Sequence, residues 1–241
     1  MIMYFEFEKY LFAVMLLFFM QCVACFGQEI VIDNRDNNEY KTVVIGKQVW
    51  MAENMRYLPS VNSPEDISYE DIFNPKYYVY GYYGTDATEA MKTEEYSTYG
   101  ALYNQKAAKS ACPKGWHLPK DTDWKKLEKA LGMKGGVINE IGNRGTSQGV
   151  SMAGNAELWV ANGKVNFKNQ LFGKSGFMAL PAGYLGIDKK YHEKGGKASF
   201  WSSTEYCEGF SYFRSVGVNS LAVYRNNNDN TAAMSVRCIK N

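Results

Sequence analysis

The amino-acid sequence predicts a mixed α+β fold. Strand-like runs open the chain, two helical segments occupy its middle, and strand-like runs separated by Gly and Asn turns close it. The 241 residues are 46% hydrophobic and 22% charged, so the chain can bury a core, which excludes a disordered protein. The formal net charge is only +2, and we therefore expect no nucleic-acid partner.

The N-terminal segment predicts export. No charged residue occurs from Tyr10 to Gly27, and the ten residues Leu11–Met20 are all apolar. A membrane span needs about 20 apolar residues, whereas a run of this length is typical of a signal peptide. We expect residues 1–27 to be removed, leaving residues 28–241 as a single domain in the periplasm, on the outer surface or in the medium.

Two alternatives remain open at this end of the chain. Cleavage before Cys25, in the imperfect lipobox Cys22-Val23-Ala24-Cys25, would attach the protein to a membrane through a lipid, and an uncleaved membrane anchor is the other alternative. After cleavage at Gly27, three cysteines remain. In an oxidising compartment we expect two of them to pair and one to stay free. They are Cys112, Cys207 and Cys238.

The first strands are predicted over Glu29–Asp33 and Tyr40–Met51, with Gly46 supplying a hairpin turn. Residues 58–98 contain prolines, scattered acids and a tyrosine run without apolar periodicity, and we expect a long surface excursion rather than a second domain. The tyrosines either form a binding face or pack the segment onto the body, and packing is the favoured interpretation. These are Tyr77, Tyr78, Tyr80, Tyr82 and Tyr83.

Two helices are predicted in the middle of the chain, over Tyr99–Ala111 and Thr122–Leu131. Asp121 is the expected N-cap of the second helix, and Gly132 ends it. Its apolar stripe consists of Trp124, Leu127 and Leu131, and its solvent side of Lys125, Lys126, Glu128 and Lys129. We expect Trp124, together with Trp116 and Trp201, to lie in the core rather than in a ligand site.

The C-terminal half is predicted to contain loops from Gly135 to Gly176 and then a series of strands. The strands are expected over Phe177–Tyr184, Ser199–Glu205, Phe210–Val216, Leu221–Arg225 and Ala233–Ile239.

No catalytic motif emerges from the sequence. G-x-S-x-G and H-E-x-x-H do not occur, and Gly173-Lys174-Ser175 lacks the first glycine of a phosphate-binding loop. With only His117 and His192, a tetrahedral zinc site is hard to assemble. We expect a protein without enzymatic activity, cofactor or metal, in which His117 is structural and Cys207 is a partly buried spare cysteine.

Six motifs, in this order, resemble the Fibrobacter succinogenes major paralogous domain, a family of exported bacterial proteins without a settled biochemical role. The resemblance covers about residues 40–241 and leaves the segment 58–98 outside. The motifs are Val49–Asn54, Tyr99–Tyr103, Cys112–Pro119 with Asp123-Trp124, Gly176–Tyr184, Phe200–Glu205 and Ser235–Cys238.

A more distant resemblance is to the formylglycine-generating-enzyme branch of the C-type lectin-like fold. It implies two helices packed on short antiparallel strands with long loops, and a disulfide between Cys112 and Cys238 that leaves Cys207 free. Lys120 and Asp123 stand where that branch has a Thr–Glu capping box. Its catalytic cysteines and the calcium motifs of sugar-binding lectins have no counterpart, so neither activity is implied.

The tract Tyr224–Asn230 resembles the variable, ligand-contacting tract of lectin-like proteins diversified by retroelements, although an Asn-rich solvated turn is an equally good interpretation. Arg214 among aromatic residues indicates the rim of a binding face. The favoured hypothesis is a non-catalytic module that binds a glycan, a peptide or another surface ligand; the alternative is an assembly subunit of a cell-surface structure. The expected contact residues are Tyr212, Phe213, Arg214, Asn219, Tyr224, Arg225, Asn226, Asn227, Asn228, Asp229 and Asn230.

Overall fold

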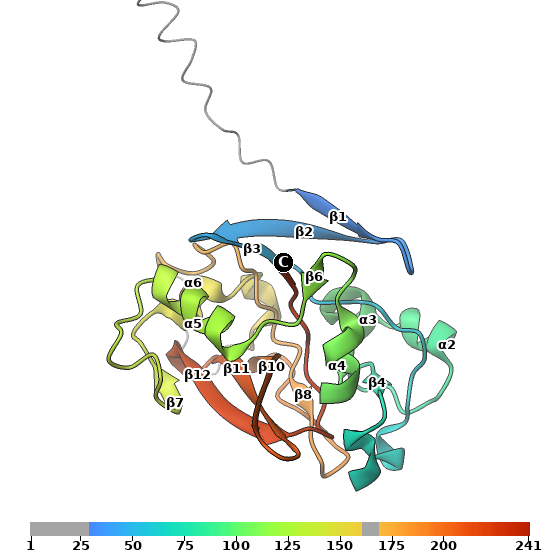
Figure 1. The fold of residues 1–241 in the computed structure, drawn as a ribbon. Coiled ribbons are helices and arrows are strands. Elements are labelled where there is room, and N and C mark those ends of the chain that lie inside the picture. The colour runs from blue at the N-terminus through green and yellow to red at the C-terminus, as the bar shows by residue number, and fades with distance from the viewer. Residues whose placement is uncertain (1–28, 161–168) are drawn as a thin grey trace, which may run out of the picture.

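The computed structural model describes residues 29–160 and 169–241, so the expected signal peptide lies outside the described residues (Figure 1). Strands and a few short helices alternate along this part of the chain, which confirms the α+β prediction. No helix in these two ranges is both long and apolar enough to cross a membrane.

A five-stranded antiparallel sheet joins the beginning of the described chain to its end. The β2–β3 hairpin turns at Gly46 as predicted, with φ at 63°. A side chain at Gly46 would place its Cβ only 2.8 Å from the Cβ of Ala130, so glycine is required for close packing as well. The strand order is β1 (Ile30–Asp33), β2 (Asn38–Ile45), β3 (Gln48–Met51), β13 (Ile239–Lys240) and β6 (Trp116–His117).

A four-stranded antiparallel sheet forms the opposite side of the domain. Its order is β10 (Lys197–Cys207), β11 (Phe210–Gly217), β12 (Ser220–Asp229) and β7 (Gly142–Arg144). The Asn-rich residues 226–229 lie inside β12, where Asn228 pairs with Ser211. The interpretation of this tract as a turn is therefore wrong, because β11 supplies a continuous partner strand.

Within residues 29–160 and 169–241, five short helices and two small hairpins complete the regular structure. The helices are α2 (Ala87–Met91), α3 (Glu94–Tyr99), α4 (Gln105–Ala111), α5 (Asp121–Ala130) and α6 (Gln148–Met152), and single 3-10 turns occur at Pro64–Asp66, Tyr69–Ile72 and Ala156–Leu158. The hairpins pair β4 (Tyr77–Tyr78) with β5 (Leu102–Tyr103), and β8 (Tyr184–Leu185) with β9 (Tyr191–His192).

Only the second half of the predicted helix over Tyr99–Ala111 is helical, as α4; Tyr99 is the last residue of α3, and β5 lies between the two helices. Gly100 adopts a φ of 77° and ends α3. The Tyr103 N–H then donates to the carbonyl of Met234, which holds this stretch extended, and Asn104 caps the start of α4 by accepting from the Ala107 N–H.

Helix α5 begins at Asp121, so the expectation that Asp121 is its N-cap is wrong. Lys120 occupies the cap position, and the carboxylate of Asp123 accepts from the Lys120 N–H at 3.0 Å. Asp123 thus supplies the acidic half of a capping box. Asp121 is free to accept from arginines of the four-stranded sheet.

Two predicted strands are mostly absent. In Phe177–Tyr184, only Tyr184 belongs to a strand; Met178 has a φ of 55°, and the carbonyls of Phe177 and Met178 accept from buried Arg237 instead. In 233–239, three consecutive residues form isolated bridges to three different segments. A segment whose successive residues have different neighbours forms no continuous ladder.

Helix α5 lies between the two sheets (Figure 1), and its apolar side chains belong to the buried cluster that fills this space. The Trp124 ring is 4.9 Å from Trp50 of β3 and 5.9 Å from Phe200 of β10. Trp124 and Leu127 are fully buried, as their spacing predicts. Trp116 and Trp201 are buried too, which confirms the core assignment of all three tryptophans.

The segment 58–98 is built into the core and is not a surface excursion. Leu58, Val61 and Val79 pack into one apolar cluster, and Ile67 and Tyr78 into a second. The segment consists of coil, 3-10 turns and short helices, so its buried side chains have no regular spacing. This is why apolar periodicity could not reveal its role.

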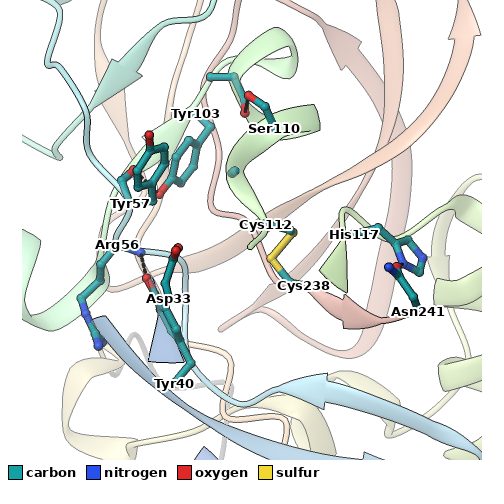
Figure 2. The surroundings of a disulfide bond; sticks show 12 residues. Asp33, Tyr40, Arg56, Tyr57, Tyr103, Ser110, Cys112, His117, Cys238 and Asn241 are labelled. Carbon is teal, nitrogen blue, oxygen red and sulfur yellow. Dashed lines mark hydrogen bonds between the residues drawn. A yellow bond between two sulfur atoms is a disulfide. The ribbon is translucent and has the colours of Figure 1, made fainter. Parts of the chain in front are cut away.

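A disulfide joins Cys112, at the end of α4, to Cys238, directly before β13 (Figure 2). This confirms the predicted pairing. Cys207 is a free thiol, but it is exposed and not partly buried as expected, because it ends β10 beyond the core. Arg35 adds a second connection here: it pairs with Asp33 and donates to the carbonyls of Ser110 and Ala111. The N-terminal hairpin is thereby attached to the helix that the disulfide anchors.

Replacing Cys112 and Cys238 together by Ala should lower the free energy of unfolding by about 5 kcal/mol, because the bond closes a loop spanning 126 residues. Chemical denaturation of the double variant and the parent measures this difference. Cys207→Ser is the control and should leave stability unchanged. Peptide mapping without reductant that finds Cys207 in a disulfide would contradict the assignment.

Candidate functional site

The two faces of the four-stranded sheet differ in chemistry. Phe200, Val216 and Val223 point into the core that contains α5. Because side chains alternate along a strand, their neighbours point to the opposite, outer face. One cross-strand row on that face consists of Ser199, Ser215, Tyr224 and Asn143, each paired with the next by the strand register.

An open cleft of about 750 Å³ lies between this outer sheet face and the β8–β9 hairpin. Its volume is in the range of small-molecule binding sites. The sheet wall is neutral except for Lys197, at the start of β10, and the other charged groups lie on the hairpin wall. The sheet contributes Asn143, Ser199, Phe213, Ser215, Tyr224, Asn226, Asn227 and Asn228, among others, and the hairpin contributes Tyr184, Ile187, Asp188, His192 and Glu193.

The polar groups on the sheet wall hold one another in place. The rings of Phe213 and Tyr224 are 5.9 Å apart, and the Tyr224 hydroxyl accepts from the Asn226 side-chain amide at 2.8 Å. The side-chain carbonyl of Asn226 accepts in turn from the backbone N–H of Asn227. Aromatic area and amide groups are therefore presented in a defined arrangement.

The hairpin wall is ordered by its own contacts. The His192 ring stacks on Tyr184 at 5.1 Å and lies 2.9 Å from the Asp188 carboxylate. That hydrogen bond from His192 lowers the pKa of Asp188. Lys189 and Glu193 both have positive φ values, at 63° and 57°, an uncommon conformation for residues with side chains.

The tyrosine run of the segment 58–98 supports this hairpin from behind. The Tyr191 ring of β9 lies 4.9 Å from Tyr80 and 5.6 Å from Tyr83, and its hydroxyl donates to the Tyr82 carbonyl. Burial raises the pKa of Tyr191 far above its ordinary value, so it stays neutral. Tyr77 and Tyr78 are buried. Packing is thus the main role of the run, as the favoured interpretation states.

Comparison with protein families identifies the chain. The model of the Fibrobacter succinogenes major domain matches residues 43–240. The chain belongs to this family. No curated protein and no solved structure matches it. The residues matched by the Fibrobacter succinogenes major domain include the segment 58–98 and every residue that lines the cleft.

The cleft contains six of the expected contact residues: Phe213, Asn219, Tyr224, Asn226, Asn227 and Asn228. The other five do not line it. Arg225 lies over the Tyr212 ring at 4.1 Å on the opposite face, and Asp229 accepts from Thr231. Asn230 is buried. Alternation along β11 and β12 turns Arg214 and Arg225 away from the cleft, and Asn230 follows the end of β12.

The expectation that Arg214 and Arg225 contact ligand is wrong, because both side chains are buried in an ion-pair network under the sheet. Arg214 Nε donates to Glu128 at 2.6 Å, and Arg225 donates to both carboxylate oxygens of Asp121 at 2.9 and 3.0 Å. Arg144 of β7 forms a two-bond pair with Glu128. We name this group the Glu128 network: Asp121, Glu128, Arg144, Arg214 and Arg225.

The placement of Glu128 on the solvent side of its helix is also wrong. Glu128 is fully buried, since arginines from β7 and β11 reach it across the core face. A carboxylate of this kind is stable inside a protein only when it is paired and hydrogen-bonded. Its partners lie 16 and 86 residues away in sequence, so helical periodicity carries no signal of them.

The hairpin residues of the cleft were not predicted as site residues, nor were Asn143 and Ser199. A usable signal existed only on the sheet, where alternation predicts that Phe213 and Ser215 share a face. His117 lies outside the cleft: its Nδ1 is 2.7 Å from the Asn241 side-chain oxygen. Residues 29–160 and 169–241 contain no group of three His, Cys, Asp or Glu side chains placed to hold a metal.

The stability of the domain should fall as pH is lowered through the acidic range. Burial by itself would raise the pKa of Asp121, but hydrogen bonds from Arg225 and the charge of Arg214 outweigh burial and hold that pKa well below its ordinary 3.8. At a pH between the lowered pKa and the ordinary 3.8, Asp121 is mostly protonated in the unfolded chain but not in the folded protein. Lowering the pH through this range therefore favours unfolding.

The measurement is urea denaturation between about pH 5 and pH 2. Asp121→Asn should be less stable at neutral pH by about 3–5 kcal/mol, because it leaves buried arginines without a counter-charge, and its stability should depend less on pH. Asp66→Asn, at an exposed carboxylate, is the control and should keep the parent's pH dependence. An unchanged dependence in Asp121→Asn would contradict the assignment.

Proposed function

We propose that this domain is an exported, non-catalytic binding module whose ligand occupies the cleft between the four-stranded sheet and the β8–β9 hairpin. The observation that carries the proposal is the outer sheet face, which presents aromatic rings and side-chain amides to a cleft of about 750 Å³. Tyr and Asn are the side chains that adaptable binding surfaces use most. The walls are held by internal contacts, so little ordering is needed when a ligand binds.

A C-type lectin-like fold is part of this proposal. Its support is the end of the chain, which returns to the body in two ways: β13 pairs with β3, and the disulfide joins Cys238 to Cys112 at the end of α4. An experimental structure of the protein, superposed on lectin-like domains, tests this assignment.

Export is supported by the uncharged N-terminal run and by the disulfide, since disulfides persist mainly in oxidising compartments. When the full chain is produced in a bacterial host, the mature protein should begin at Gln28. Intact mass and N-terminal sequencing check this prediction. A lipid-modified Cys25 at the N-terminus would support the lipoprotein alternative, and retention of Met1 would contradict cleavage.

The double variant Asn226→Ala/Asn228→Ala should weaken binding at least tenfold, or about 1.4 kcal/mol, for any ligand found on glycan and protein arrays. Both amides line the cleft and are only partly buried, so the melting temperature should change little. Asn34→Ala/Asn139→Ala removes two exposed amides outside the cleft and should bind like the parent. Calorimetry measures the affinities.

The competing function is an assembly subunit that buries the same face against another protein. Light scattering after size-exclusion chromatography separates the two functions. A monomer that binds an array ligand supports the binding module. A stable oligomer that Asn226→Ala/Asn228→Ala dissociates supports assembly. A stable interface between subunits buries at least about 1,000 Å², so it would cover the cleft face that carries these two residues.

A further inference from the structure

We propose that the ligand of the cleft is an uncharged carbohydrate, a proposal that rests on the binding function above. The cleft brings together neutral hydrogen-bonding groups, aromatic faces and charged groups that already have partners. Each of these three features favours a polyhydroxylated, uncharged ligand.

Each charged side chain in the lining of the cleft already has a hydrogen-bond or ion-pair partner. Asp188 lies 2.9 Å from His192, and Glu193 lies 2.9 Å from Lys197. These four residues are all the charged groups in the lining of the cleft. An ionic ligand is bound through unpaired opposite charges, and here it would first have to break one of these pairs. Apart from Lys197, which is paired with Glu193, the sheet wall offers it only neutral side chains.

The polar groups of the sheet wall both donate and accept hydrogen bonds. Side-chain amides such as Asn143, Asn226 and Asn228 have an oxygen acceptor beside an NH₂ donor, and hydroxyls also have both capacities. The vicinal hydroxyls of a sugar require this combination. Ser199 lines the cleft and is only 1% exposed, and its hydroxyl has no partner among the described protein groups.

Aromatic rings stand on both walls of the cleft. Phe213 and Tyr224 lie together on the sheet, and Tyr184 lies on the hairpin. The C–H face of a pyranose ring packs against an aromatic face while its hydroxyls reach neighbouring amides. Tyrosine suits this contact because it combines an apolar ring with a polar end.

The same geometry argues against an extended peptide. Peptides that add a strand to a sheet bind its open edge, where backbone N–H and C=O groups are unpaired. The cleft instead lies on the face of the sheet, over β11, which pairs with a strand on each side, and over β12, which pairs with β11 and, at Val223–Arg225, with β7. Recognition here depends on side chains alone.

The test is a glycan array carrying neutral, sialylated, sulfated and uronic-acid oligosaccharides, beside a peptide array, probed with the purified protein. Binding should be confined to neutral glycans. Titration with a neutral hit should give a Kd that changes less than about twofold between 0.05 and 0.5 M salt, because no ion pair forms. Selective binding of the acidic glycans, or a steep salt dependence, would overturn the proposal.

Two buried serines provide a matched pair of variants. Ser199 and Ser211 both have buried hydroxyls without a protein partner, but only Ser199 lines the cleft. Ser199→Ala should fold like the parent and weaken sugar binding at least threefold, and Ser211→Ala should have no effect. Tyr184→Ala should weaken it at least tenfold, whereas exposed Tyr69→Ala should not. Equal affinities in Ser199→Ala, Tyr184→Ala and the parent would overturn the site.

The outcomes distinguish this proposal from the binding function itself. If only a peptide or protein binds, and Tyr184→Ala abolishes that binding, the binding module stands and the carbohydrate is wrong. If neither array gives binding, both proposals are wrong.

Discussion

Burial of the Glu128 carboxylate under the four-stranded sheet is the constraint on which the rest of this domain depends. Glu128 and Asp121 on α5 hold Arg144, Arg214 and Arg225, one arginine from each of three adjacent strands. Leaving any of these charges unpaired in the core is costly, so helix and strands are joined in one arrangement. The aromatic contacts of Trp124 then join the same helix to the other sheet.

This network also determines which side chains reach the cleft. A slip of one residue in β11 or β12 would turn Arg214 or Arg225 outward and bury Phe213 or Tyr224 in their place. The ion pairs therefore oppose such a slip more strongly than apolar packing alone would. The aromatic and amide character of the outer face follows from the charges on the inner face.

The second wall of the cleft depends on a different part of the molecule. The β8–β9 hairpin is short and has two residues with positive φ, and two-stranded hairpins are marginally stable alone. Tyr191 packs against Tyr80 and Tyr83, so the segment 58–98 supplies the missing support. A segment without sequence periodicity thus positions one side of the candidate site.

The sequence by itself determined the features that depend on local pattern: the hairpin at Gly46, the buried stripe of Trp124 and Leu127, and the α+β class. Resemblance to a family added the pairing of Cys112 with Cys238. Only the tertiary structure decided that Glu128, Arg214 and Arg225 are buried, that residues 226–229 form a strand, and that Tyr184 and His192 face the cleft. The physical reason is that a charged or polar side chain is placed by partners far away in sequence. Local spacing indicates the period of a helix or strand, but it does not indicate which charged residue a neighbouring element will place beside it.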